Sequence, residues 1–275
     1  ASYISRQGIS WDNISGVIIT MPGLINDIKG TNKTFLYEAG FSLKDYFELQ
    51  YKKKVYIIND VKLAAFAELR HGAAEGKNNA IIILMDWGIG IGLIINGKVY
   101  MGADGYAGEM GHMLFIEDGD LCYCGKRGCL ETVASGVALV RQAQKDIDLG
   151  IPTLLNQKYD AEFLVPKDII SAALEGDQYA IELITKLGNH LGKAIANLVQ
   201  LFNPEIIILS GKFAAAQDLI TIPIKQSVNT YAMPTLAKGC AIEVSTLGNS
   251  CPRAGLVSYF VERYIKEEIQ NCAKK

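Results

Sequence analysis

The chain has 275 residues, a formal net charge of −2 and a sequence isoelectric point near 6.0. Binding to the phosphate backbone of a nucleic acid requires clustered Lys and Arg, which a near-neutral chain lacks. These residues by themselves are therefore not expected to bind DNA. The composition is 49% hydrophobic and 20% charged, which excludes a disordered chain. At this length two lobes are favoured over a single core, with the cleft between them as the expected ligand site.

The sequence predicts no export signal and no membrane segment. The apolar run Ala80–Leu84 is too short to span a bilayer, and Ala1–Ile4 lacks a charged segment followed by an apolar core. We therefore expect a cytoplasmic protein with no membrane partner. Three of the six Cys fall within eight residues, a spacing that suits a metal better than a disulfide framework.

The first predicted elements are strand, turn, strand and helix. Val17–Thr20 has the pattern of a buried strand and ends at the turn Met21–Gly23, and Val55–Ile58 has the same pattern. The second strand leads through Asn59–Asp60 into an Ala- and Leu-rich helix over Val61–Leu69. Polar side chains at such a strand-to-helix junction can cap the helix or contact a ligand.

A polar, Gly-containing stretch at Gly72–Asn79 separates the two predicted lobes. The smaller N-terminal lobe is expected to comprise residues 1–76 together with a closing helix in residues 255–275. The larger lobe is expected to comprise residues 77–254 and to contain the cysteine cluster.

The second half of the chain predicts a partly antiparallel sheet followed by helices. Ala80–Met85 and Gly92–Ile95 are strand patterns, and Asn96-Gly97 is a strong signal for a two-residue hairpin. The remaining predicted elements are helices at Ala134–Gln144, Lys167–Leu174, Ala180–Phe202 and Ala254–Glu268, and a strand at Ile206–Leu209. This alternation indicates an α/β fold.

Four metal-ligating side chains lie close together in the sequence: His112, Cys122, Cys124 and Cys129. One imidazole and three thiolates match structural zinc of the Cys3His type, and the glycines inside C-x-C-G-x-x-G-C let the backbone wrap around an ion. Unconnected thiols and a redox pair are the alternatives. Packing does not explain the spacing, however, and a disulfide within C-x-C is strained. The sequence therefore predicts a structural Zn²⁺ ion.

The run Gly105–His112, followed by Cys122–Glu131, closely resembles the signature of the ROK family of repressors, open reading frames and sugar kinases. The resemblance extends to Met21–Gly23, Asn203-Pro204 and Leu209–Gly211. It implies the family fold, which has two α/β lobes of the actin-like ATPase, ribonuclease H-like, type. It also implies a truncated N-terminal lobe, because the D-x-G-G-T hairpin at the start of the kinases has no counterpart here.

By the same resemblance, five side chains occupy the sugar-contacting positions of the family: Asn59, Asp60, Glu109, His112 and Glu131. Carboxylates accept hydrogen bonds from sugar hydroxyls, and an amide supplies both a donor and an acceptor. His112 can bind zinc through one ring nitrogen and present the other to the sugar. From the residues alone, Asp60 is also explained as a helix cap, and the two glutamates as solvated surface residues.

The nucleotide half departs from the kinases of the family, in which the residue matching Asp60 is the general base and two glycine-rich loops bind ATP. Here Asp86–Gly88 replaces Gly-Thr-Gly, and Ser210–Lys212 replaces a run of glycines. An Asp repels phosphate, and a Trp fills the space beside it. We therefore expect a degenerate nucleotide site at Gly88, Gly90 and Gly211.

These departures favour the effector-binding and oligomerisation domain of a ROK transcriptional repressor of carbohydrate metabolism. Its ligand would be a sugar or phosphosugar, its assembly a homodimer or tetramer, and its DNA contacts would come from a helix-turn-helix upstream of Ala1. Sugar binding would change the angle between the lobes and so the spacing of two DNA-binding heads. The sugar half is nearly intact, although Lys62 replaces the usual Asn.

The alternative function is an ATP-dependent sugar kinase of the glucokinase or fructokinase type. In that case Asp60 would be the general base, with ATP and Mg²⁺ as cofactors. A coupled assay for ADP release distinguishes the two functions.

Overall fold

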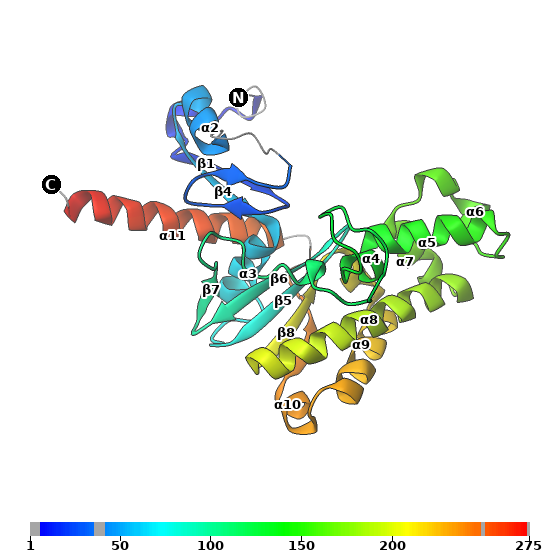
Figure 1. The fold of residues 1–275 in the computed structure, drawn as a ribbon. Helices are drawn as coiled ribbons and strands as arrows, with labels where there is room; N and C mark the ends of the chain where they lie inside the picture. Colours follow the sequence, from blue (N-terminus) through cyan, green and yellow to red (C-terminus); the bar gives the residue numbers. More distant parts are fainter. Residues whose placement is uncertain (1–5, 36–41, 249–250, 274–275) are drawn as a thin grey trace.

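The computed structural model describes residues 6–35, 42–248 and 251–273 (Figure 1). The start at Ala1–Ile4, on which the expectation about export rests, lies outside the described residues, as do short parts of both predicted lobes. The described residues form an α/β fold, as the sequence predicted, with a five-stranded sheet, a two-stranded parallel sheet and a two-stranded ribbon. The division into lobes 1–76 plus 255–275 and 77–254 stays a prediction.

The two-stranded parallel sheet positions the first loop of the site. Its strands, β1 (Gly16–Met21) and β4 (Lys54–Asn59), are paired so that Met21 lies opposite Asn59. Both strands therefore end at one edge, which brings the turn after β1 beside the residue that follows β4. The prediction of a buried strand at β1 is wrong in one respect. β1 is mostly half-buried, because the described residues pair it along one edge only.

Short elements connect these two strands. They are the antiparallel ribbon of β2 (Ile25–Asn26) and β3 (Thr31–Asn32), and the helix α2 (Leu43–Tyr51). The hydroxyl of Ser42 caps α2 by accepting a hydrogen bond from the Asp45 N–H. The sequence analysis predicted no helix in this stretch.

The five-stranded sheet has the order β7-β6-β5-β8-β9. Its strands are β5 (Ala80–Met85), β6 (Ile89–Ile95), β7 (Lys98–Tyr100), β8 (Ile206–Ser210) and β9 (Ala241–Val244). β5 is antiparallel to β6 and parallel to β8, which confirms the mixed sheet. The hairpin predicted at Asn96-Gly97 is also confirmed, and both residues have the positive φ, 52° and 69°, of a tight two-residue turn.

Successive residues of β5 pack on opposite sides of this sheet. Ile81 and Ile83 belong to the core that contains the helices of the second half, whereas Ile82 packs with residues of α3 (Asp60–His71). The helices of the second half are α4 (Glu131–Ala134), α5 (Gly136–Asp148), α6 (Leu155–Lys158), α7 (Pro166–Leu174), α8 (Gln178–Phe202), α9 (Asp218–Tyr231) and α10 (Pro234–Gly239). The described residues also form four 3-10 turns, the first of them ahead of β1: η1 (Trp11–Asn13), η2 (Met110–His112), η3 (Ala161–Phe163) and η4 (Lys212–Ala216).

The C-terminal helix α11 (Cys251–Ala273) connects the two sheets. It packs along α3, and in Figure 1 it runs below the β1–β4 sheet. Its Tyr259 is buried against Phe66 of α3, with ring centroids 5.1 Å apart, and against Tyr56 of β4 at 6.4 Å. No helix in the described part of the chain is both long and apolar enough to cross a membrane.

Replacing Gly92 by Ala tests the close approach of β6 to α3. The added methyl would lie 2.6 Å from the Cβ of Ala65 and 2.9 Å from the carbonyl oxygen of Val61. We expect the free energy of unfolding to fall by about 1–3 kcal/mol, measured by urea denaturation. The control is Gly239→Ala, whose methyl meets no atom within 4 Å. Equal losses in both variants would contradict the packing of β6 on α3.

Candidate functional site

A cavity of about 560 Å³ lies where loops of the two sheets meet. The turn after β1 and the β4–α3 junction form one side, and the β5–β6 loop and the segment around η2 form the other. Seven of the eight residues predicted for the sugar and nucleotide sites line it, as does the predicted metal ligand Cys124; the seven are Asn59, Asp60, Gly88, Gly90, Glu109, His112 and Glu131. The volume is in the range of small-molecule sites.

Gly211, the eighth predicted position, does not line this cavity. Its φ is 90°, and a methyl added there would lie 2.4 Å from the carbonyl oxygen of Met85. A glycine at this position is therefore required by the turn after β8, whether or not a nucleotide binds.

Asn59 links α3 to the turn after β1. Its Oδ1 accepts hydrogen bonds from the N–H groups of Val61 (3.0 Å) and Lys62 (3.2 Å), which caps α3. Its Nδ2 donates to the carbonyl oxygen of Gly23 at 3.0 Å. The role of N-cap of α3, which was the alternative explanation for Asp60, thus belongs to Asn59.

Asp60 is a half-buried carboxylate at the first position of α3, where Oδ1 accepts from the Val61 N–H at 2.8 Å. Burial raises the pKa of Asp60, and the nearby charge of Asp86 adds to this rise, whereas the backbone hydrogen bonds oppose it. A carboxylate with a raised pKa is a stronger base than a solvated one.

Lys62 is a cation buried behind the carboxylates. Its side chain is 1% exposed, and its ammonium group donates a hydrogen bond to the carbonyl oxygen of Ala107. Burial lowers the pKa of Lys62, and the charges of Glu109 and Asp60 oppose this. Glu109 is exposed and lines the cavity, and partial desolvation raises its pKa while the charge of Lys62 lowers it. A buried cation that does not itself line the cavity therefore acts on two of the acids that do, Asp60 and Glu109.

Glu131, the first residue of α4, connects the cysteine-containing segment Cys122–Cys129 to the loop between β5 and β6. Its Oε2 accepts a hydrogen bond from the Ile89 N–H at 3.2 Å. A methyl added to Gly88 would lie 2.8 Å from the same oxygen, so glycine at this position lets the carboxylate approach. Glu109 and Glu131 thus both line the cavity, where Glu131 is half-buried and Glu109 is exposed.

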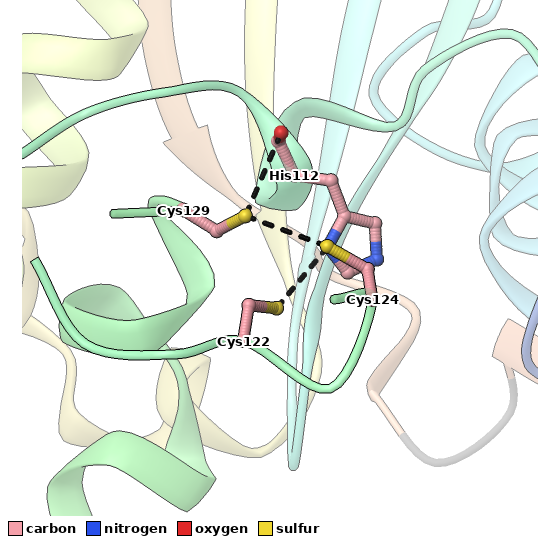
Figure 2. A group of neighbouring side chains, drawn as sticks. All are labelled: His112, Cys122, Cys124 and Cys129. Atoms are coloured by element: carbon pink, nitrogen blue, oxygen red, sulfur yellow. Dashed lines mark hydrogen bonds between the residues drawn. The ribbon is translucent and has the colours of Figure 1, made fainter. Parts of the chain in front are cut away.

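The four predicted metal ligands converge (Figure 2), and their ligand atoms lie within 4.8 Å of one another. Nδ1 of His112 lies 3.6 Å from the sulfur of Cys122, and the sulfurs of Cys124 and Cys129 are also 3.6 Å apart. The other ring nitrogen, Nε2, is 3.0 Å from the hydroxyl of Tyr123, which lines the cavity. One imidazole can therefore serve both the cluster and the cavity.

The donor set suits a soft divalent cation. Burial raises the pKa of Cys129 to about 12, so its thiolate needs a compensating positive charge, which a metal ion supplies. The loop is already tightly folded, because the Cys122 N–H donates to Lys126 at 2.8 Å and the Gly125 N–H donates to Cys122 at 3.0 Å. These residues could hold a metal without a change of fold.

Most backbone N–H groups of the loop between β5 and β6 donate hydrogen bonds within the protein. The Asp86 N–H donates to the Gly88 carbonyl (3.1 Å), and the Trp87 N–H donates to Oδ1 of Asp86 (2.9 Å). The Ile89 N–H donates to Glu131, as described above. Three of the four amides from Asp86 to Ile89 are thus occupied within the protein.

The first backbone N–H groups of α5 also donate hydrogen bonds within the protein. The N–H groups of Gly136 and Val137 donate to the carbonyls of Asp86 and Trp87, each at 3.0 Å, and Ala138 donates to Oγ of Ser135 at 3.2 Å. These first amides of a helix are the groups that commonly bind phosphate.

Lys212 forms an ion pair with Asp86, with Nζ and Oδ1 2.6 Å apart. From the sequence, the two residues were separate departures from the nucleotide site of the kinases. The structure joins them, so the charge of Asp86 is partly neutralised and its repulsion of phosphate is weaker than expected.

Three polar residues of the cavity lining were not identified from the sequence: Lys33, Thr34 and Tyr123. The position of Tyr123 between two predicted metal ligands was the available signal. Lys33 and Thr34 follow β3, and nothing in their local sequence indicated a site.

Replacing Asp60 by Asn tests the burial of its charge. Asn keeps the acceptor for Val61, but it cannot ionise. Because the folded-state pKa of Asp60 lies above the unfolded value of about 3.9, ionisation removes stability as the pH rises from that value through the folded pKa. We expect the variant to melt at a higher temperature than the wild type at pH 7, and to lose this advantage below about pH 4.

The control for this comparison is Asp45→Asn, at an exposed position in the first turn of α2. Its carboxylate favours the helix N-terminus, so its loss should slightly lower the melting temperature at pH 7. A lower melting temperature of Asp60→Asn at pH 7 would contradict the raised pKa.

Comparisons with known proteins all point to the same protein family. The model described as "ROK family" matches residues 1–263. The chain is 37% identical over 254 residues to a glucokinase of Halalkalibacterium halodurans, covering 90% of this chain and 76% of that protein. It is 30% identical over 266 residues to the xylose repressor of Bacillus spizizenii, covering 96% of this chain and 65% of the repressor.

Solved structures show the same division into regulators and kinases. A ROK family transcriptional regulator, a homologue of the Escherichia coli Mlc protein, superposes with a TM-score of 0.81 at 29% identity over 94% of this chain and 65% of its own. A ROK glucokinase from Streptomyces griseus, in complex with glucose and AMPPNP, gives a TM-score of 0.78 at 30% identity over 94% of this chain and 83% of its own. On the match over residues 1–263 and these relatives, the chain belongs to the ROK family.

Proposed function

We propose that this chain is the sugar-binding domain of a ROK transcriptional regulator and that it does not transfer phosphate. The observation that carries the proposal is the occupation of the amides where a phosphate cradle would lie. Catalysis of phosphoryl transfer depends on preorganised donors aimed at the phosphate oxygens. Here three of the four N–H groups from Asp86 to Ile89, and the first three N–H groups of α5, donate to the protein itself.

The composition of the cavity supports a neutral sugar as the ligand. The carboxylates of Asp60, Glu109 and Glu131 are acceptors for hydroxyl groups, and His112 lines the same space with its Nε2 hydrogen-bonded to the hydroxyl of Tyr123. A phosphosugar is less favoured, because three carboxylates would repel its phosphate. The Streptomyces griseus relative was solved with glucose, and a xylose repressor is also a relative.

The cysteine cluster has a structural role in this proposal. A Zn²⁺ ion held by His112 and the three thiolates would fix the loop from Gly111 to Glu131. It would thereby hold His112 and Glu131 against the sugar without taking part in chemistry.

The remaining parts of a regulator would act through other surfaces. The chain spans about two thirds of the length of the xylose repressor it matches, and DNA contacts would come from a helix-turn-helix outside the 275 residues. A homodimeric or tetrameric assembly, a division into two lobes and a change of lobe angle on sugar binding belong to the same proposal. So does a cytoplasmic location.

A sugar kinase is the second candidate, and two observations favour it. The chain is 37% identical to a glucokinase, and burial raises the pKa of Asp60, which would make it a stronger base toward a sugar hydroxyl. ATP and Mg²⁺ would then be required, and the amides of the β5–β6 loop would have to exchange their partners for phosphate oxygens.

Sugar binding and turnover separate the two candidates. We expect D-glucose or D-xylose to give a saturable isotherm in calorimetry. In a coupled assay with ATP and Mg²⁺, neither should release ADP above the no-sugar control. Asp60→Asn is expected to weaken binding, because an amide replaces a carboxylate that accepts from hydroxyls, whereas Asp45→Asn should bind as the wild type. Sugar-dependent ADP release that Asp60→Asn abolishes would establish the kinase instead.

Metal analysis tests the cysteine cluster independently. We expect about one equivalent of zinc per purified chain, and a lower melting temperature after chelation. Cys124→Ser should lose most of the metal, whereas Cys272→Ser, at an exposed position on α11, should retain it. Less than about half an equivalent in the wild type would contradict the Cys3His site.

A further inference from the structure

A second cavity of about 320 Å³ adjoins the first. Both cavities are lined by Pro22, Trp87, Gly88, Tyr123 and Glu131. A ligand bound in the first cavity can therefore extend into the second past Tyr123 and Glu131. The first of these residues contacts His112, and the second is a predicted sugar contact.

The second cavity gathers large apolar side chains that are exposed to solvent. These are Phe35 (58% exposed), Trp87 (44%), Leu121 (59%), Tyr123 (67%) and Val137 (40%). Single exposed apolar residues are ordinary, but five around one hollow indicate a surface that an apolar partner covers.

The polar groups of this cavity are largely committed to the protein. The hydroxyl of Thr132 donates to the Cys129 carbonyl at 2.7 Å. The hydroxyl of Ser135 donates to the Glu131 carbonyl at 2.7 Å and accepts from Ala138. A second sugar ring needs several donors and acceptors and would find few here. A flat apolar ring needs none and gains from stacking on Trp or Tyr.

The cavity is also poorly suited to a nucleotide. The amides of Trp87 and Val137, which adjoin it, already donate within the protein, and Arg141 is the one Lys or Arg among its lining residues. A triphosphate needs several donors or a metal to neutralise its charge.

We propose that the second cavity binds the aromatic aglycone of an aryl glycoside whose sugar ring occupies the first cavity. The inference rests on the proposed sugar-binding function and names the class of ligand: a glycoside and not a free monosaccharide. The sugar ring supplies specificity through the carboxylates, and the aglycone supplies affinity by covering Leu121, Tyr123 and Val137.

Calorimetry with matched glycosides tests the proposal. The probes are the methyl and phenyl D-glucosides and D-xylosides, each as α and β anomers. For one sugar and one anomer, the phenyl glycoside should bind at least about tenfold more tightly than the methyl glycoside, as expected for burying an aromatic ring. Val137→Ser should remove most of this advantage and leave the affinity for the methyl glycoside unchanged.

The control variant is Val257→Ser, an exposed valine of α11 that lies outside both cavities. It should keep the full preference for the phenyl glycoside. A loss of preference in this variant would show that the effect is not local to the second cavity and would overturn the assignment.

The outcomes separate this inference from the proposed function. Binding of free or methylated sugar with no gain from the phenyl group would overturn the inference and leave sugar binding intact. No binding of any sugar would overturn both. Tighter binding of cellobiose than of phenyl glucoside would replace the aglycone by a second sugar, and displacement of phenyl glucoside by ATP would assign the cavity to a nucleotide. Either result overturns the proposal.

Discussion

Burial of helix α3 on every side fixes the geometry of the site. All residues from Val61 to Leu69 are buried, and glycines of β6 and α11 let their backbones approach the helix. Methyl groups added to Gly92 and Gly255 would lie 2.6 Å from the Cβ of Ala65 and 2.4 Å from the carbonyl oxygen of Leu63. An element packed this closely cannot shift without opening voids or forcing overlaps. Asp60 and Lys62 lie in its first turn, so both charges are held in place before any ligand arrives.

The two sides of the cavity differ in what they leave free for a ligand. The carboxylate side offers acceptors to hydroxyl groups, whereas three of the four amides from Asp86 to Ile89 already donate to the Gly88 carbonyl, to Asp86 and to Glu131. Opening that loop for a phosphate would break several hydrogen bonds, each contributing about 0.5–1.5 kcal/mol net. The charge of Asp86 is a weaker barrier than the sequence implied, since Lys212 pairs with it. The hydrogen-bonded amides of the β5–β6 loop are therefore a stronger argument for a regulator over a kinase than the charge of Asp86 is.

Local patterns predicted most of the fold, and contacts between distant residues account for what they missed. The Asn96-Gly97 hairpin, the strands β4, β5 and β8 and the long helix α8 follow from turn signals and apolar periodicity. Helix α9 was missed because Pro223 lies inside it and interrupts the pattern. The seven cavity residues were predicted from their resemblance to a family motif. The pairing of Lys212 with Asp86, 126 residues away, depends on the folded arrangement, which no local pattern encodes.

His112 contacts the cysteine cluster through Nδ1 and lines the cavity, where its Nε2 is hydrogen-bonded to the hydroxyl of Tyr123. Two sites that share one side chain are thermodynamically coupled, and such coupling is reciprocal. Whatever factor a bound metal adds to the affinity for a ligand at Nε2, the ligand must add to the affinity for the metal. The occupied cavity would then protect the cluster from chelators and oxidants, so the ligand would act as a stabiliser of the metal loop. Depletion of the metal would correspondingly lower the affinity of the cavity for its ligand.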